Sequence, residues 1–128
     1  MRALLDTHAL LWWLADDPAL SAPALRLISD PANTMLVSAA SAWEVATKVR
    51  IGRLPTAVQL VADFEGWLKR ERFEPLGVSV DHAIRAGQLP GPHKDPFDRM
   101  LIAQALAENV PLVSNETIFD SYAVRRVW

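Results

Sequence analysis

Ala3-Leu4-Leu5-Asp6-Thr7 decides how this chain folds, because a short apolar run stops at a carboxylate and an apolar segment of helical character follows at residues 9–14. That order predicts a strand, a turn and a helix. It recurs where the apolar run 35–37 precedes a helix expected over residues 41–49, and a further strand is expected at residues 111–113. Repetition of this order is typical of an α/β protein.

The remaining elements continue the alternation of short strands and helices. Further helices are expected over residues 24–28, 56–70, 81–89 and 95–108, with a weak strand at 73–78 and an edge strand at 124–128. We therefore predict one α/β domain over residues 1–128, with a mainly parallel central sheet and helices on both faces. A chain of 128 residues is long enough for one such core and too short for two.

The composition is that of a soluble globular protein. Apolar residues make up 51% and charged residues 22%, so disorder is not expected. The longest apolar run, residues 9–15, is far shorter than the ~20 residues of a membrane helix, and no membrane association is expected. The absence of Cys excludes disulfides and thiol chemistry and suits a cytoplasmic location. A net charge of −2 argues against coating duplex nucleic acid by bulk electrostatics.

Four acidic residues stand beside apolar runs, and they suggest a metal site. They are Asp6, Glu44, Asp98 and Glu116. Groups at the carboxyl ends of parallel strands converge on one crevice, so these carboxylates are expected to become neighbours. Like charges at such proximity raise one another's pKa unless a cation lies among them. Carboxylate oxygens suit Mg²⁺ or Mn²⁺, so the sequence predicts that these acids form a catalytic metal site.

Two of these acids have a plainer structural interpretation. Asp6 is a natural N-cap for the helix that follows it, although Thr7 could do the same work. Glu44 would complete a capping box that begins at Ser41, and it would pair with Lys48 four residues further on. Helix capping and ion pairing can explain each of these residues alone. They explain less well why four acids occupy similar positions in the chain.

Asp98 is harder to explain by helix capping. Asp95 fits the N-cap of the last long helix and Pro96 its first residue, which leaves Asp98 as a first-turn acid. Asp98 also shares a face with Leu101 in a helix that is apolar on nearly every side. An unpaired carboxylate there would cost several kcal/mol. Glu116 fits an exposed turn acid about as well as a ligand.

Other common sites lack their motifs. His8, His82 and His93 have no H-x-x-x-H or H-E-x-x-H spacing, so a zinc site is not expected. Glycine-rich nucleotide loops and the G-x-S-x-G of serine hydrolases do not occur. Trp12 and Trp13 are adjacent on one expected helix and cannot both face the same core, so one is expected to meet a second chain.

Four stretches around the acids carry a family resemblance, in order along essentially the whole chain. They are Leu4-Leu5-Asp6-Thr7-His8, Ser41-Ala42-Trp43-Glu44, Asp95-Pro96-Phe97-Asp98-Arg99-Met100-Leu101-Ile102-Ala103-Gln104-Ala105 and Leu112-Val113-Ser114-Asn115-Glu116. With these stretches the chain resembles PIN-domain proteins of the VapC toxin type. The third stretch is quite specific, and Asp-Thr-His after an apolar strand is moderately so.

The resemblance implies a metal-dependent endoribonuclease. Asp6, Glu44 and Asp98 would bind or orient Mg²⁺ or Mn²⁺, with Thr7 and Ser114 as polar neighbours. RNA would be cut within a single-stranded or looped region, and growth inhibition would follow. The ion would help a water molecule attack phosphorus and would neutralise charge on the phosphate oxygens.

The resemblance also implies protein partners. The chain would be the toxin of a type II toxin–antitoxin pair, it would form a homodimer, and a cognate antitoxin protein would cover an acidic groove. We place this groove at the helices that carry Trp43 and Trp67. An antitoxin Arg reaching the carboxylates would compete with the metal through charge-assisted hydrogen bonds.

One departure from the family pattern keeps alternative interpretations open. The family usually places Asp where this chain has Glu116, so the fourth ligand is longer and would act through water or not at all; Asp95 is an alternative ligand. One alternative is therefore a degenerate PIN-fold interaction module without catalysis. Another is a phosphoacceptor receiver domain, which is disfavoured because Asp6 lacks an acidic partner and no Lys follows Lys94.

Overall fold

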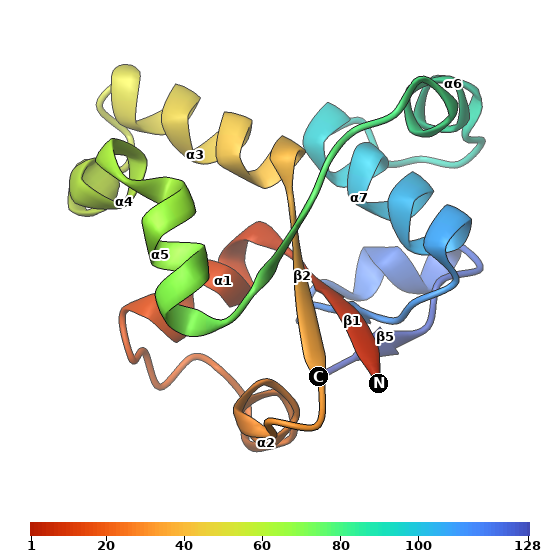
Figure 1. Ribbon diagram of the computed structural model, residues 1–128. Coiled ribbons are helices and arrows are strands. Elements are labelled where there is room, and N and C mark those ends of the chain that lie inside the picture. Colours follow the sequence, from red (N-terminus) through yellow and green to blue (C-terminus); the bar gives the residue numbers. More distant parts are fainter.

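A single parallel sheet organises the computed structural model, which describes residues 1–128. Its strands are β1 (Arg2–Leu5), β2 (Thr34–Ser38), β3 (Glu74–Leu76), β4 (Leu112–Val113) and β5 (Arg126–Val127). Their order in the sheet is β3-β2-β1-β4-β5, and every neighbouring pair is parallel. The first strand in the sequence is therefore the central strand in space (Figure 1).

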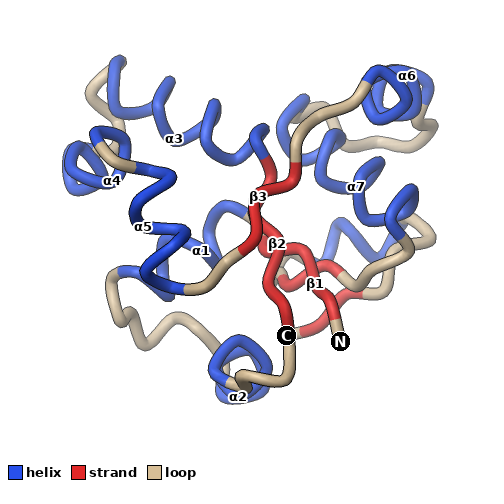
Figure 2. Tube along the Cα trace, in the orientation of Figure 1, coloured by secondary structure: helices blue, strands red, loops and turns tan.

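Helices cover both faces of this sheet, as Figures 1 and 2 show. They are α1 (Thr7–Leu14), α2 (Ala22–Ser29), α3 (Ala39–Arg50), α4 (Val58–Ala62), α5 (Phe64–Glu71), α6 (Val80–Gln88) and α7 (Pro96–Glu108), with 3₁₀ turns η1 (Pro55–Ala57) and η2 (Thr117–Ser121). The predicted architecture, a mainly parallel sheet between helices, is confirmed. None of the helices is both long and apolar enough to cross a bilayer.

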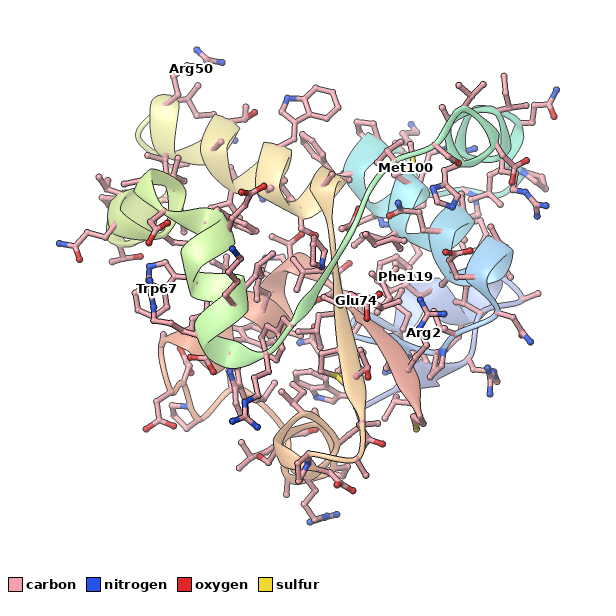
Figure 3. The ribbon with its side chains drawn as sticks, viewed as in Figure 1. Arg2, Arg50, Trp67, Glu74, Met100 and Phe119 are labelled. Carbon is pink, nitrogen blue, oxygen red and sulfur yellow. The ribbon has the colours of Figure 1, made fainter.

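Two hydrophobic cores lie on opposite faces of the sheet because side chains alternate along each strand. Leu5 packs into the core shared with α1, α2 and α5, whereas Leu4 packs into the core shared with α7 and η2. Phe119 of η2 is completely buried in this second core, and Figure 3 shows it beneath α7. The three inner strands β2, β1 and β4 are mainly apolar on both faces, as expected for a parallel sheet covered on both sides.

The helix after β2 begins earlier than the sequence suggested. Its N-cap is Ser38, whose Oγ accepts a hydrogen bond from the Ala40 main-chain N–H at 2.9 Å. The predicted capping box from Ser41 to Glu44 is therefore wrong. Strand β2 passes directly into α3 without a loop, so Ser41 and Glu44 both lie inside the helix and are buried.

The helix predicted over residues 56–70 is broken. The 3₁₀ turn η1 leads into α4, which ends at Ala62, and α5 begins at Phe64. Asp63, with φ of −147°, separates the two helices. The break lets Leu60 pack beneath α3 while Leu68 packs against the sheet. The Asp63 carboxylate folds over Gly66, where a Cβ would lie 2.2 Å from its Oδ2.

The strand order locates the place where ligands bind in such sheets. Connections leave β1 towards β2 on one side, and the chain later returns to β4 on the other side. In open α/β sheets a crevice forms at this switch point, outside the carboxyl ends of the strands. Receiver domains have the order 2-1-3-4-5 instead, so the receiver alternative is excluded by the topology.

Candidate active site

Strand β1 delivers the first acid to the crevice. Asp6 follows it directly and caps α1, its Oδ1 accepting a hydrogen bond from the Ala9 main-chain N–H at 2.7 Å. Thr7, the other capping candidate, donates its hydroxyl to Ser41 Oγ at 3.0 Å. Asp6 is only 3% exposed. Burial raises the pKa of its carboxyl, and the Ser114 hydroxyl partly offsets the rise.

Glu44 reaches the crevice from the second turn of α3. Its Oε2 lies 2.6 Å from Lys48 Nζ, which is the i,i+4 ion pair expected from the sequence. Its Oε1 is buried and has no hydrogen-bond partner. A buried carboxylate oxygen without a partner is energetically costly. This oxygen therefore marks a position where a cation would be stabilised.

Asp98 lies in the first turn of α7. Asp95 caps the helix, and its Oδ1 accepts hydrogen bonds from two main-chain N–H groups of that turn at 2.8 and 3.2 Å. Burial, followed by the charges of Asp95 and Glu116, raises the pKa of Asp98 from 3.8 to about 7. Glu44 adds to the increase and His93 opposes it. Without an ion, the crevice resists full ionisation at neutral pH.

Glu116 enters the crevice from the segment between β4 and η2. Its main-chain N–H donates to Ser114 Oγ at 3.0 Å, and its Oε1 lies 3.5 Å from His8 Nδ1. The side chain is 32% exposed. One of its oxygens, one oxygen of Asp98 and a ring nitrogen of His93 all lie within 4.8 Å of one another.

The four carboxylates lie close enough to perturb one another. The charge of Glu116 acts on both Asp6 and Asp98, and the charge of Glu44 acts on Asp98. The residues come from four different segments of the chain. Hard oxygen donors, one of them without a partner, fit a divalent ion such as Mg²⁺ or Mn²⁺. No thiolate is present to favour a softer metal.

Sequence reasoning missed the histidines of this region. His8 approaches Glu116, and His93 approaches Asp98, with Nε2 2.9 Å from Asp98 Oδ2. Neither has a spacing that a metal motif would reveal. One sequence feature could have pointed to His93. It lies in the segment 89–96, which three prolines make stiff and which leads into the N-cap of α7.

Trp43 and Trp67, which were expected to share a groove, lie in separate hollows. Trp43 is 67% exposed and packs edge-on against Phe97, beside a hollow of about 450 Å³ between α3, α6 and α7. Trp67 lines a groove of about 680 Å³ between α1 and the η1–α4 segment. Figure 3 shows Trp67 on the outer side of the molecule beside α4 and α5. The second groove also includes His8, which contacts Glu116.

The adjacent tryptophans of α1 each pack against other aromatic side chains of the same chain. Trp12 lies against Trp128 with ring centres 5.7 Å apart. Trp13 lies against Phe73, and its Nε1 donates to Glu71 Oε2 at 3.0 Å. Both remain partly exposed, and contact of one of them with a second chain stays a prediction.

Comparisons with known sequences agree with the geometry. The family model of the PIN domain matches residues 3–125. Ribonuclease VapC22 of Mycobacterium tuberculosis (strain ATCC 25618 / H37Rv) is 30% identical over 122 residues, which span 93% of this chain and 90% of that protein. Ribonuclease VapC16 of the same organism is 39% identical over 73 residues, spanning 54% of this chain and 50% of that protein.

Solved structures share the fold. VapBC2 from Rickettsia felis, crystallised with a DNA fragment from its promoter, contains a chain that superposes with a TM-score of 0.73 at 21% identity. That match covers 99% of this chain and 98% of the other. DNA-bound VapBC from Salmonella typhimurium gives a TM-score of 0.72 at 20% identity, covering 99% of this chain and 97% of the other.

Proposed function

Because this chain belongs to the PIN domain family, we propose that residues 1–128 form one PIN domain that acts as a metal-dependent endoribonuclease. Its acidic crevice would hold Mg²⁺ or Mn²⁺ and hydrolyse phosphodiester bonds of RNA. The observation that carries the proposal is the partnerless, buried Oε1 of Glu44, set among carboxylates that come from three other segments.

Each acid has a distinct part in the proposal. Asp6 and Asp98 hold the ion: Asp6 has one oxygen fixed as a helix cap, and Asp98 has a pKa that a nearby cation would lower. The free oxygen of Glu44 lies where a cation would be stabilised, and it would also orient the attacking water beside the ion. Glu116, longer than the family's usual Asp and partly exposed, completes the set from the outer side. A bound divalent ion would neutralise charge on the phosphate and lower the pKa of water.

The biological role we propose is that of the toxin in a toxin–antitoxin pair. The relatives are named VapC ribonucleases, and the chains with the same fold come from VapBC complexes. The groove between α1 and the η1–α4 segment would receive an antitoxin segment, because it is largely apolar and reaches His8 beside Glu116. An antitoxin Arg entering there would neutralise the carboxylates and exclude the metal. A homodimer and a cytoplasmic location remain part of the proposal.

Cleavage of RNA by purified variants tests the enzymatic proposal. We expect the wild type to cut a single-stranded RNA in Mg²⁺ or Mn²⁺ and to stop on addition of EDTA. Asp6→Asn and Asp98→Asn should lower the rate by about 100-fold or more, since each removes a charge that the ion requires. Asp81→Asn, an exposed acid paired with Arg85 on α6, is the matched control and should cut normally. Unchanged cleavage by the crevice variants would mean that the site is misplaced.

A degenerate interaction module is the second candidate, and the position of Glu116 favours it. Its carboxylate is one-third exposed and turned towards His8. If the longer side chain impairs the site, Glu116→Asp should cut RNA faster than the wild type. A wild type that neither binds Mn²⁺ nor cuts RNA, yet binds an antitoxin, would support this second candidate over the enzyme.

A further inference from the structure

The loop before α7 holds His93 rigidly above the crevice. The Arg99 guanidinium donates hydrogen bonds to the main-chain carbonyl oxygens of Leu89 and His93, the latter at 2.9 Å. The His93 main-chain N–H donates to the Tyr122 hydroxyl at 3.0 Å. Gly91, with φ of +109°, lies against the Tyr122 ring, where a Cβ would approach within 2.7 Å. The backbone is thus fixed on both sides of His93.

The contacts of the imidazole assign its proton. Nδ1 accepts a hydrogen bond from the Asp95 main-chain N–H at 3.4 Å. A main-chain N–H can only donate, so Nδ1 carries a lone pair and the proton of the neutral ring is on Nε2. The ring also lies against Phe119, with centres 5.8 Å apart. His93 therefore presents an N–H group, not a lone pair, at Nε2.

The Nε2 atom lies beside Asp98, one of the proposed metal ligands. Nε2 is buried, lies 2.9 Å from Asp98 Oδ2 and has no hydrogen bond of good geometry. The proximity of His93, Asp98 and Glu116 would by itself suggest a nitrogen ligand. Metal binding through Nε2 would move the ring proton to Nδ1 and break the hydrogen bond from Asp95, because a metal-bound nitrogen must be free of hydrogen. A protonated Nε2 instead suits a hydrogen-bond donor that holds a metal-binding carboxylate in place.

We propose that His93 is a positioning residue. Its Nε2–H, now 2.9 Å from Asp98 Oδ2 but poorly aligned, turns on ion binding to donate to that oxygen and leaves the other oxygen of Asp98 to bind the divalent ion. This inference rests on the proposed function. Outer partners of this kind commonly contribute 10–100-fold to metal affinity, because they hold the ligand in its binding orientation.

Binding of Mn²⁺ to the full chain, measured by EPR of the free ion, tests the role of His93 without relying on activity. We expect His93→Ala to bind Mn²⁺ about tenfold more weakly than the wild type. His93→Gln places an amide N–H near the position of Nε2, so it should restore affinity to within about twofold of the wild type. Pulsed EPR of the wild type should show no ¹⁴N coupling of a directly bound imidazole. Melting temperatures identify any variant that fails to fold.

The outcomes separate this inference from the proposed function. Asp98→Asn should abolish Mn²⁺ binding; normal binding there would overturn the proposed site itself. If Asp98→Asn loses Mn²⁺ binding while His93→Ala binds Mn²⁺ as tightly as the wild type, only the role of His93 is overturned. Direct ¹⁴N coupling would make His93 a ligand, and equal losses in His93→Ala and His93→Gln would exclude a donor role. A change only in the KM for RNA would assign His93 to the substrate instead.

Discussion

The raised pKa of Asp98 makes the net charge of the crevice change with pH near neutrality. Its carboxyl has a pKa of about 7 in the folded, ion-free protein against an ordinary value of 3.8, mainly because it is buried and secondarily because Asp95 and Glu116 are near. The folded state therefore binds this proton more tightly than the unfolded chain does. The resulting stabilisation is complete at low pH and is lost as the pH rises through about 7.

We therefore expect the ion-free protein to melt at a higher temperature near pH 5 than near pH 8, by roughly 5 °C. Melting curves in EDTA across this range provide the measurement. Asp98→Asn should flatten the dependence, although Asp6, whose pKa is also raised, will leave part of it. A wild type that loses stability on acidification over this range would contradict the pKa assigned to Asp98.

At the residue scale, the sequence predicted the acids better than their surroundings. Asp6, Glu44, Asp98 and Glu116 were found because a carboxylate beside an apolar run is costly without a purpose, and the structure places them near one another. Their binding of metal stays a prediction. His93 was not found, since its role depends on contacts that Arg99, Tyr122 and Asp95 make only in the folded chain.

At the element scale, the N-terminus of α7 separates a capping role from a ligand role. Asp95→Ala removes two hydrogen bonds to the first turn and should lower the free energy of unfolding by about 1 kcal/mol. Asp95→Ser keeps a capping oxygen and should recover most of this loss. Urea denaturation measures both.

Ion binding by the same pair of variants completes the test. Both remove a negative charge that raises the pKa of Asp98 and that also attracts a cation. These two effects oppose each other, so Mn²⁺ affinity near neutral pH should change far less than in Asp98→Asn. Strong loss of Mn²⁺ binding in the well-capped Asp95→Ser would show instead that Asp95 is a ligand.

Element boundaries were predictable where local signals were strong. Asp95 and Pro96 predicted the start of α7, and this helix does begin at Pro96. The break at Asp63 was not predictable, because the apolar spacing of residues 56–70 continues through it. It arises from tertiary packing: Leu60 and Leu68 belong to different hydrophobic clusters.

At the scale of the whole molecule, a bound ion would tie together four separate segments. We expect Mn²⁺ at 100 times its Kd to raise the free energy of unfolding by about 2.7 kcal/mol, because the ion binds only the folded chain. Thermal melting with and without Mn²⁺ measures this gain, and Asp98→Asn should lose it. An equal gain in that variant would place the ion elsewhere on the protein.

The central position of β1 has a consequence for synthesis on the ribosome. Asp6 is synthesised long before Glu116, and its strand keeps one unpaired edge until β4 at Leu112–Val113 has left the exit tunnel. Glu116 follows only then. We therefore expect a polypeptide that is released before Glu116 to lack an assembled crevice and to leave RNA uncut, so that the proposed toxicity begins only after this late segment is made.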